Sequence, residues 1–499
     1  MTSTRGQLVT RSSQRVAADP GRVVTRLFVP GQEGFEHQES RAGTVLSRTL
    51  ALADDEVRET LQDVLDRFGD RHRDLIGTLR RHAAELADRL DPNCEISEER
   101  MLLLGAIFTN EYAIEGAALC NPSIVAGPDQ SDTAPGSLRF VMSVRGIGEG
   151  HRSTIGFRTG VVDAAGHATV DEPAPFASTG RIETTLLDAA VFRTELDTQG
   201  RGGEAADYVF DALGDLFTRF DLDERLDSLR AHLSTRGQAE DTIATIRDFA
   251  DRFYAVEFPD AVTLSERVLW PAMAAEHAGI EDARFVRFVG DDDSITYYAT
   301  YTAYSGSQIS QQLLTTTDFR TFTSVPLVGQ AAANKGLGLF PRRIAGRYAA
   351  MSRSDRETNS VTLTDHLPVW TTAWPCQQPV EVWETLHLGN CGPPIETDAG
   401  WLVLTHGVGP MRTYSIGAIL LDLDDPTRVI GRLRRPLLSP AADAQNGYVP
   451  NVVYSCGGLV HAGTLVIPFG ICDSAIGVAT VPLADLLAEF AEEPVSPRW

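Results

Sequence analysis

Residues 279–304 read GIEDARFVRFVGDDDSITYYATYTAY, and this stretch indicates how most of the chain folds. A first short strand carries charged side chains, a run of Gly and Asp follows, and a stronger apolar strand comes after it. Gly and Asp favour tight turns, whereas aromatic and β-branched residues favour strands. The stretch therefore predicts short β-strands joined by a turn.

The same pattern recurs along the chain in groups of short strands, which begin near residues 121, 281, 337, 385 and 448. With residues 183–256 left out, the groups are spaced by about 50–60 residues, which is in the range of a propeller blade. We therefore predict a mainly β protein folded as a five-bladed β-propeller, with a β-sandwich as the structural alternative. In a propeller the innermost strands meet at the central axis, so residues far apart in the sequence would lie together there.

Two regions show the apolar periodicity of amphipathic helices instead. The first stripe, within residues 54–90, consists of Val57, Leu61, Val64, Leu65 and Phe68. Residues 98–117, which include ERMLLLGAIF, are predicted to continue as helix. The second stripe, within residues 183–256, consists of Val209, Leu213, Leu216, Phe217 and Phe220.

These patterns predict four parts of the chain. The first, residues 1–118, consists of an N-terminal arm over residues 1–45 and a helical region after it. The second, residues 119–182, is the first propeller blade, and the third, residues 183–256, is a helical insertion. The fourth, residues 257–499, contains the remaining blades and a C-terminal helix over LADLLAEFAEE. Three roles are open for the helical parts. The first is to wall off the propeller mouth, the second is to form the interface of a homo-oligomer, and the third is simply to pack against the propeller flank. We expect the protein to be a homo-oligomer.

The composition limits the partners that the protein can have. The 499 residues carry a formal net charge of −24 at pH 7, and nucleic acids and anionic membranes select cationic surfaces, so we expect neither as a partner. No apolar run is long enough to span a bilayer, and the first twenty residues lack the apolar segment of a secretory signal. The six cysteines show no CxxC spacing, which is typical of reduced thiols in a cytoplasmic protein.

Residues 334–353, NKGLGLFPRRIAGRYAAMSR, concentrate positive charge in this acidic chain. They hold Lys335, the only lysine of the sequence, together with several arginines. One explanation is a solvated edge strand protected by arginines. The other is an anion-binding site, because an anionic ligand needs a focused positive pocket inside an otherwise repulsive field.

If the innermost strands meet at an axis, their polar residues form one cluster. First strands supply Asn121, Ser123, Asp282, Arg342, Arg343, His387 and Asp473, and second strands supply Arg145, Arg353 and His406. This set lacks the grouped carboxylate or His ligands of a metal site, so we predict no metal and no cofactor. Taken singly, Asp282 could equally belong to a structural ion pair. The histidines could be core residues, and the arginines could be solvated surface charges.

From Asn121 onward, apart from the insertion, the chain resembles the family-130 glycoside hydrolases and phosphorylases, which act on β-mannosides. The resemblance rests on the segments GIEDARF, YYATYTAY, NKGLGLFPRRIAGRYAAMSR, GPPIETDAGWLVLTHGV, YSIGAILLDLDDPTRVIGR, GYVPNVVYSCGG and FGICDSAIGVA. These segments occur in the order that the family has. The family fold is a five-bladed propeller, in agreement with the repeat pattern.

The resemblance implies a role for each matched position. Asp282 matches the catalytic acid, whose proton is expected to pass through the sugar 3-hydroxyl. The sugar-binding positions are Asn121, Ser123, Arg145, Asp473 and Tyr414, and the phosphate-binding positions are Arg342, Arg353, His406 and His387.

Two departures from the family pattern affect these roles. His387 stands in HLGNCG where many members carry the lysine of a KIGAG motif, so the pocket is cationic only if His387 is protonated or other residues compensate. NGYVP lacks the acidic residue that many members carry before the glycine, so acceptor contacts are expected to differ.

Inverting cleavage of a glycoside needs an acid at the leaving oxygen and a nucleophile on the opposite face. Water also needs a carboxylate base, whereas phosphate is already an anion and needs cationic ligands instead. We therefore predict phosphorolysis of manno-oligosaccharides, preferably β-1,2-linked, to α-mannose 1-phosphate and a shortened acceptor, with inorganic phosphate as co-substrate. The alternatives are an inverting β-mannoside hydrolase on the same fold and a non-catalytic sugar-binding propeller.

Overall fold

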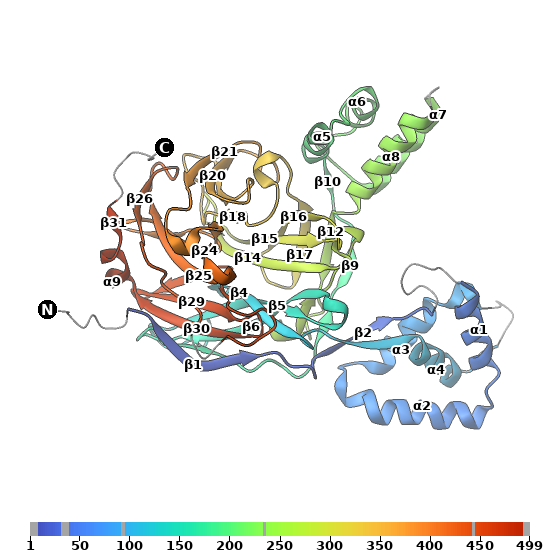
Figure 1. Cartoon of the computed structure of the whole chain (residues 1–499). Helices are drawn as coiled ribbons and strands as arrows, with labels where there is room; N and C mark the ends of the chain where they lie inside the picture. Colours follow the sequence, from blue (N-terminus) through green and yellow to red (C-terminus); the bar gives the residue numbers. More distant parts are fainter. Residues whose placement is uncertain (1–7, 31–38, 91–94, 233–235, 442–444, 493–499) are drawn as a thin grey trace. The chain divides into compact units, whose positions relative to one another are not determined.

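The computed structural model describes residues 8–30, 39–90, 95–232, 236–441 and 445–492 (Figure 1). The chain divides into two compact units. The β unit consists of Met1–Ala18, Ala117–Pro173 and Thr179–Trp499, and the helical unit consists of Asp19–Gly116 and Ala174–Ser178. Strands outnumber helices in the β unit, so the fold is mainly β, as predicted.

The β unit begins with two groups of antiparallel strands that share one sheet. The first group is β4 (Ala118–Ala126), β5 (Leu138–Ile147), β6 (Ser153–Val162) and β7 (Ala168–Val170). The second group is β14 (Gly279–Val289), β15 (Ile295–Tyr304), β16 (Ile309–Thr316) and β17 (Thr321–Pro326). The groups meet where Gly279 pairs with Ser153. The strands predicted from residues 279–304 are therefore β14 and β15.

Three more groups follow along the chain, each in its own sheet. The third group is β18 (Gly338–Leu339), β19 (Tyr348–Ser352), β20 (Asn359–Thr364) and β21 (Ala373–Gln377). The fourth is β22 (His387–Asn390), β23 (Ile395–Thr397), β24 (Gly400–Val408), β25 (Tyr414–Leu421) and β26 (Val429–Arg432). The fifth is β27 (Val453–Tyr454), β28 (Leu459–His461), β29 (Thr464–Ile471) and β30 (Ala475–Pro482). Each group begins close to a start that the repeat pattern predicted.

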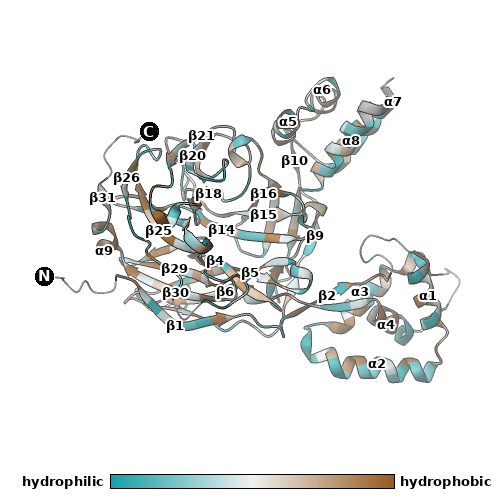
Figure 2. Cartoon of the chain, viewed as in Figure 1, coloured by the Kyte–Doolittle hydropathy of each residue, from teal (hydrophilic) through white to brown (hydrophobic). Residues whose placement is uncertain are grey.

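Apolar side chains hold these groups together. β24 is buried along its whole length, because β22 and β25 flank it and apolar residues cover both of its faces. Figure 2 shows β25 as hydrophobic and most of α2 (Asp54–Phe68) as hydrophilic. Between the first two groups, the rings of Phe157 and Phe285 lie 6.0 Å apart, and Phe322 stacks on Phe157 at 5.6 Å. This aromatic cluster fixes the first group against the second.

The N-terminal residues add a strand to the fifth group. β1 (Thr10–Ala17) pairs antiparallel with β30, with Thr10 opposite Thr480 and Ala17 opposite Ala475. The prediction of an arm is therefore wrong for this strand, while residues 1–7 and 31–38 of the predicted arm lie outside the described residues. TRSSQRVA is mostly exposed and polar, so it lacks the apolar alternation by which a buried strand is recognised.

The helical unit has a core of its own. It contains β2 (Val23–Leu27), α1 (Glu39–Leu50), α2, α3 (Leu75–Ala84), α4 (Glu98–Ile107) and β3 (Thr109–Ala113). Val57 and Leu61 are buried, as their stripe predicted. The helix predicted over residues 98–117 ends at Ile107, because the next residues pair with β2. None of the helices in the described ranges is long and apolar enough to cross a membrane.

A helical insertion interrupts the β unit between β9 (Arg181–Glu183) and β12 (Tyr254–Glu257), which pair with each other. It contains β10 (Leu187–Asp188), α5 (Ala189–Thr198), α6 (Glu204–Phe210), β11 (Leu216–Phe217), α7 (Arg219–His232) and α8 (Arg236–Ala250). The stripe predicted over residues 209–220 is not one helix, since α6 ends and α7 begins within it. Gly214 and neighbouring acidic residues favour a turn there, and Phe220 is 72% exposed.

The insertion packs on the flank of the β unit. Its apolar core includes Val328, with Val325 and Val369 against it. Nε2 of His366 lies 2.8 Å from Oδ2 of Asp188, whose other carboxylate oxygen accepts the first amides of α5. Among the described residues, these contacts involve none of the predicted site positions.

Replacing residues 185–252 by a short glycine-containing turn should leave the β unit folded, because Glu183 and Ala255 already stand opposite each other. The deletion uncovers Val328, which is now 2% exposed, so we expect a loss of about 1.5–3 kcal/mol in the free energy of unfolding. All six tryptophans belong to the β unit, so urea unfolding followed by tryptophan fluorescence measures this unit alone. A variant without a cooperative fluorescence transition would contradict the prediction.

Candidate active site

Three polar residues of the predicted cluster lie where the backbone is irregular. Asn121, Asp282 and Asp473 have φ values of 48°, 56° and 50°. The pairing of β4 with β5 shifts register around Asn121, that of β14 with β15 shifts around Asp282, and Asp473 lies in the turn from β29 to β30. Asn and Asp adopt positive φ more readily than most residues, and a bulge turns a side chain out of the regular alternation. The local sequence therefore explains both the irregular backbone and the direction in which these side chains point.

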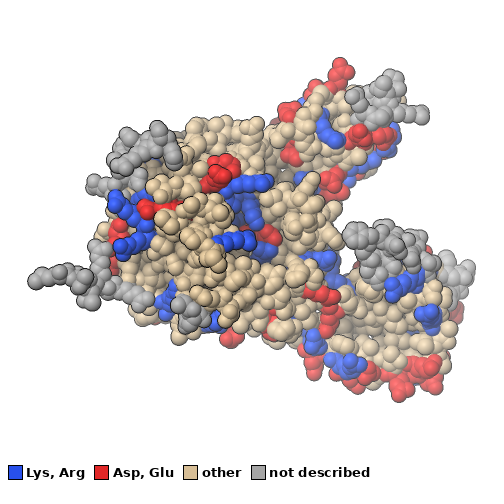
Figure 3. Space-filling model, viewed as in Figure 1, with Lys and Arg blue, Asp and Glu red and all other residues tan. Residues whose placement is uncertain are grey.

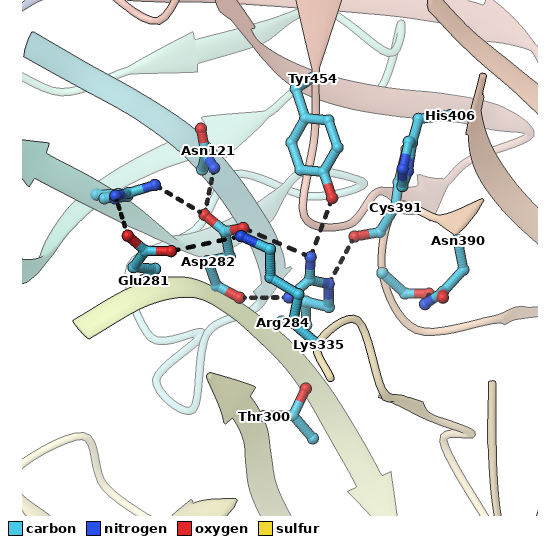
Figure 4. A network of polar contacts seen from close by, with 12 residues as sticks. Asn121, Glu281, Asp282, Arg284, Thr300, Lys335, Asn390, Cys391, His406 and Tyr454 are labelled. Carbon is cyan, nitrogen blue, oxygen red and sulfur yellow. Dashed lines mark hydrogen bonds and ion pairs between the residues drawn. The ribbon is translucent and has the colours of Figure 1, made fainter. Parts of the chain in front are cut away.

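Asp282 is the centre of a buried polar network (Figure 4). Its Oδ1 accepts a short hydrogen bond from the Asn121 amide and lies 3.4 Å from Nη1 of Arg145. Its Oδ2 lies 3.8 Å from Nη2 of Arg284, which also donates from Nη1 to the Asp282 carbonyl at 2.9 Å. Asp282 is 5% exposed, so these contacts replace the water that its carboxylate has lost.

Glu281 connects two of the cations around this carboxylate. Its Oε1 accepts from Nη2 of Arg145 at 2.5 Å, and its Oε2 lies 3.6 Å from Nζ of Lys335. The loop of Lys335 is fixed, because the backbone of Leu337 bonds to side chains of β15 and β16. The only lysine of the chain thus extends from a rigid loop to the network and remains 38% exposed at its side chain.

The two aspartates differ in their proton affinity. Burial raises the pKa of Asp282, but Arg145, Lys335, Arg284 and the Asn121 hydrogen bond together hold the pKa below its usual value. Burial raises the pKa of Asp473 to about 6, and Arg145 offsets this rise only in part. Oδ1 of Asp473 is buried and has no hydrogen-bond partner in the described part of the chain. Asp473 therefore offers a free acceptor beside an ionised Asp282.

A chain of contacts leads from Asp282 to a second cluster. Arg284 donates from Nε to the Cys391 carbonyl at 3.1 Å and from Nη2 to the Tyr454 hydroxyl at 3.0 Å. The Tyr454 ring lies 4.9 Å from the ring of His406, which belongs to β24. Figure 4 shows Tyr454 and His406 on the side of Arg284 away from Glu281.

The second cluster combines one guanidinium with two imidazoles and a phenol. Nη1 of Arg353 lies 3.0 Å from Nε2 of His406. The His387 ring is 6.1 Å from the His406 ring and 6.0 Å from the Tyr414 ring. These residues come from the end of β19 and from β22, β24 and β25, which places the predicted positions Arg353, His387, His406 and Tyr414 together.

Both histidines of this cluster are neutral at pH 7. Burial and the nearby Arg353 lower the pKa of His406 well below its usual value. Burial, Arg353 and Arg412 lower the pKa of His387 as well. A neutral His406 accepts the Arg353 hydrogen bond at Nε2, so its proton stays on Nδ1. The positive charge of the second cluster therefore comes from arginine.

Arg353 is a cation without a carboxylate partner among the described ion pairs. Its Nε is buried and has no hydrogen-bond partner in those residues either. By contrast, Arg145 has carboxylates within 4 Å on Glu281 and Asp282. Figure 3 shows Lys and Arg side chains gathered near the middle of the visible face of the β unit. The second cluster therefore has the charge and the free donors to bind an anion.

The structure does not bring Arg342 and Arg343 to these clusters. Pro341 accepts the amide of Val289, which ends β14, whereas Asp282 lies near the start of that strand. Seven residues of a strand span about 23 Å. Arg342 pairs with Glu396 through Nη2 at 2.6 Å, and its guanidinium lies 4.8 Å from the centre of the Trp401 ring. The geometry therefore does not support the expectation that Arg342 and Arg353 share one pocket.

Ser123 is placed differently from the other predicted sugar-binding residues. It is 0% exposed, and its Oγ accepts the amide of Phe285 at 3.1 Å, so it joins β4 to β14. Its contact with a ligand stays a prediction. Sequence reasoning gave no role to Glu281, Arg284 and Tyr454, and it placed Lys335 in a candidate anion-binding segment without assigning it to the site. Two of them flank Asp282 in EDAR, and a lysine that occurs once in 499 residues was itself a signal.

The raised pKa of Asp473 predicts how stability depends on pH. The folded protein binds the Asp473 proton more tightly than the unfolded chain, so this group costs stability as pH rises from about 4 to about 6. Asp473→Asn should therefore become more stable relative to the wild type across this interval. Two pKa units correspond to about 3 kcal/mol. Urea unfolding followed by tryptophan fluorescence at pH 4, 5, 6 and 7 measures the difference, and a difference independent of pH would contradict the assignment.

Comparison with known proteins adds to this geometry. The family model described as beta-1,4-mannooligosaccharide phosphorylase matches residues 230–492, a range that contains Asp282, Lys335 and Arg353. A 1,2-beta-oligomannan phosphorylase of Thermoanaerobacter sp. is 33% identical over 215 residues, which are 42% of this chain and 71% of the relative. A beta-1,2-mannobiose phosphorylase of Listeria innocua is 31% identical over 245 residues, which are 46% of this chain and 66% of the relative. The solved complex of a Listeria innocua beta-1,2-mannobiose phosphorylase with beta-1,2-mannobiose gives a TM-score of 0.44 at 20% identity, over 76% of this chain and 92% of that one.

Proposed function

This chain belongs to glycoside hydrolase family 130, and on that premise we propose that it cleaves β-linked mannosides with inorganic phosphate. It is an enzyme of the glycoside phosphorylase type, which transfers a mannosyl group to phosphate. The products are α-mannose 1-phosphate and a shortened acceptor. We further propose that the strand groups are the five blades of a propeller, because each of them supplies residues to the two clusters.

The unpaired charge of Arg353 carries this proposal. A partly buried guanidinium whose hydrogen-bond partner, among the described residues, is a neutral histidine needs an anion to balance it. The second cluster binds phosphate through Arg353, with His406 and His387 as hydrogen-bonding partners. We assign the second positive charge to Lys335, because its contact with Glu281 is loose at 3.6 Å, whereas Arg342 lies 2.6 Å from Glu396 and both histidines are neutral.

Hydrolysis by water is the competing reaction, and it needs a carboxylate base on the face of the sugar opposite the acid. Glu281 does not meet this requirement, because Arg145 and Lys335 hold it as an ion pair beside Asp282. The described ion pairs of the second cluster include no carboxylate. These observations favour phosphate over water as the nucleophile.

The proton comes from Asp282 in the proposed reaction. The surrounding cations keep Asp282 ionised in the free protein, so it has to gain a proton in the complex. A phosphate dianion near Lys335 and Arg284 offsets their charge and raises the pKa of Asp282. Phosphate therefore acts both as the nucleophile and as the group that allows the acid to hold its proton.

We propose β-1,2-mannosides as the preferred substrates. The two relatives with the identities given above are phosphorylases of β-1,2-linked substrates, while the family model carries a β-1,4 description. The first test is to incubate the protein with β-1,2- and β-1,4-mannobiose, with and without phosphate. We expect α-mannose 1-phosphate from the β-1,2 compound only when phosphate is present. Equal release of mannose in phosphate-free buffer would identify a hydrolase instead.

Asp282→Asn should lower kcat at least about a thousandfold in both directions, because the variant cannot supply the proton. The amide can still accept from Arg145, so we expect the tryptophan fluorescence spectrum and the unfolding transition to stay close to those of the wild type. Steady-state rates of phosphorolysis and of reverse synthesis measure the effect. Residual activity above a few per cent would assign the acid to another residue.

Arg353→Ala and Arg342→Ala form a matched pair that tests the phosphate site. A charge-assisted hydrogen bond contributes about 1.5–3 kcal/mol, so we expect Arg353→Ala to raise the KM for phosphate roughly 10- to 100-fold. Arg342→Ala removes a cation that pairs with Glu396, and the KM should stay within about twofold of the wild-type value. An effect of Arg342→Ala as large as that of Arg353→Ala would place phosphate elsewhere.

A further inference from the structure

A buried carboxyl group that the proposed reaction does not use lies shortly before β14 in the chain. Glu276 is 0% exposed. Its Oε1 accepts from the Tyr301 hydroxyl at 2.6 Å and from the Tyr254 hydroxyl at 3.0 Å, and its Oε2 accepts from the Ala272 amide at 2.8 Å. Burying a carboxyl group costs free energy that apolar packing would avoid, whereas a well-bonded buried network fixes one geometry. The cluster is therefore a candidate for fixing the geometry of its surroundings.

Tyr301 also faces the bulge of β14 that carries Asp282. The pairing of β14 with β15 is regular up to Glu281 and again from Arg284 onward. Between these two positions the backbone of Asp282 and Ala283 faces one residue of β15, Tyr301, which is the two-against-one arrangement of a β-bulge. Ala283 and Tyr301 are buried in the same apolar cluster. The shape of the bulge therefore depends on where Tyr301 is held.

Tyr301 thus contacts both ends of the segment from Glu276 to Asp282. Its hydroxyl bonds to the first residue, and its backbone faces the last. Between them the Ala278 amide donates to the Tyr304 carbonyl at 2.9 Å, which keeps the segment along β15. The φ of 56° at Asp282 is a conformation that residues other than glycine adopt only when surrounding contacts hold them in it. The bond from Tyr301 to Glu276 is one such contact.

We propose that Tyr301 and Glu276 form a positioning pair that holds the Asp282 bulge in the register needed for proton transfer. This inference rests on the proposed phosphorolysis, and the pair acts through the backbone of Asp282 without touching the sugar or the phosphate. Without the bond between the pair, the segment before the bulge loses an anchor, and the carboxylate can move away from Asn121 and Arg145. A displacement of about 1 Å is enough to slow a reaction about a hundredfold.

Tyr301→Phe and Tyr254→Phe form a matched pair, because each removes one hydroxyl that bonds to Glu276 while only Tyr301 faces the bulge. For Tyr301→Phe we expect kcat of phosphorolysis to fall roughly 10- to 100-fold, with the KM values for phosphate and β-1,2-mannobiose within about twofold of the wild type. Tyr254→Phe should keep kcat within about threefold. Equal kcat values for the two variants, or a Tyr301→Phe variant that changes KM alone, would overturn the inference.

Glu276→Gln is the conservative variant of the other member of the pair. Its amide oxygen can still accept the Tyr301 hydroxyl, so we expect kcat to stay within about fivefold of the wild-type value. A loss of kcat as large as that expected for Tyr301→Phe would contradict the role of Glu276 as the acceptor that holds Tyr301.

Urea unfolding followed by tryptophan fluorescence tests the pair without turnover. An ionised carboxylate that moves loses its contacts with cations, whereas the amide of Asp282→Asn has no charge to lose. Tyr301→Phe should therefore lower the urea midpoint less in the Asp282→Asn background than in the wild type, while Tyr254→Phe should lower it equally in both.

Equal midpoint shifts for Tyr301→Phe in the two backgrounds would overturn the inference. If the shifts differ as expected but the wild type forms no mannose 1-phosphate, the proposed function fails, and the positioning of Asp282 by Tyr301 is still supported.

Discussion

The stabilisation of one buried carboxylate is the constraint on which the rest of the site depends. Asp282 loses its hydration on folding, and a buried carboxylate without partners would cost several kcal/mol. Its partners come from separate strand groups: Asn121 and Arg145 from the first, Arg284 from its own strand and Lys335 from the loop before the third. The network therefore joins the strand groups at the point where we propose that the chemistry takes place, so that fold and proposed function share the same contacts.

The same network divides the site into two electrostatic halves. Around Asp282 the positive charges are matched by carboxylates, whereas Arg353 in the second cluster is paired with a neutral histidine. Arg284 and Tyr454 connect the halves through a guanidinium, a phenol and the His406 ring. In the proposed reaction, an oxyanion bound at Arg353 would complete the charge balance and at the same time strengthen the hold of Asp282 on its proton. This proposed coupling would allow a carboxylate surrounded by cations to serve as an acid.

The sequence predicted the parts of this arrangement that leave a local pattern. The strand groups and the approach of Asn121, Asp282, Arg353, His406 and Asp473 follow from repeated short strands and from the family resemblance. Arg342 was misplaced because β18 is only two residues long, so FPRR already lies at the far end of β14. β1 was missed because an exposed edge strand needs no apolar alternation. The contacts of Arg284 with Cys391 and Tyr454 join distant segments, which no local pattern records.

The most direct measurement is a crystal structure of the protein with mannose and phosphate bound together. We expect a phosphate oxygen within hydrogen-bond distance of the Arg353 guanidinium, with Lys335 turned toward the anion and Asp282 on the opposite face of the sugar. A phosphate held at Arg342, or one on the same face of the sugar as Asp282 and away from Arg353, would contradict phosphate binding at Arg353.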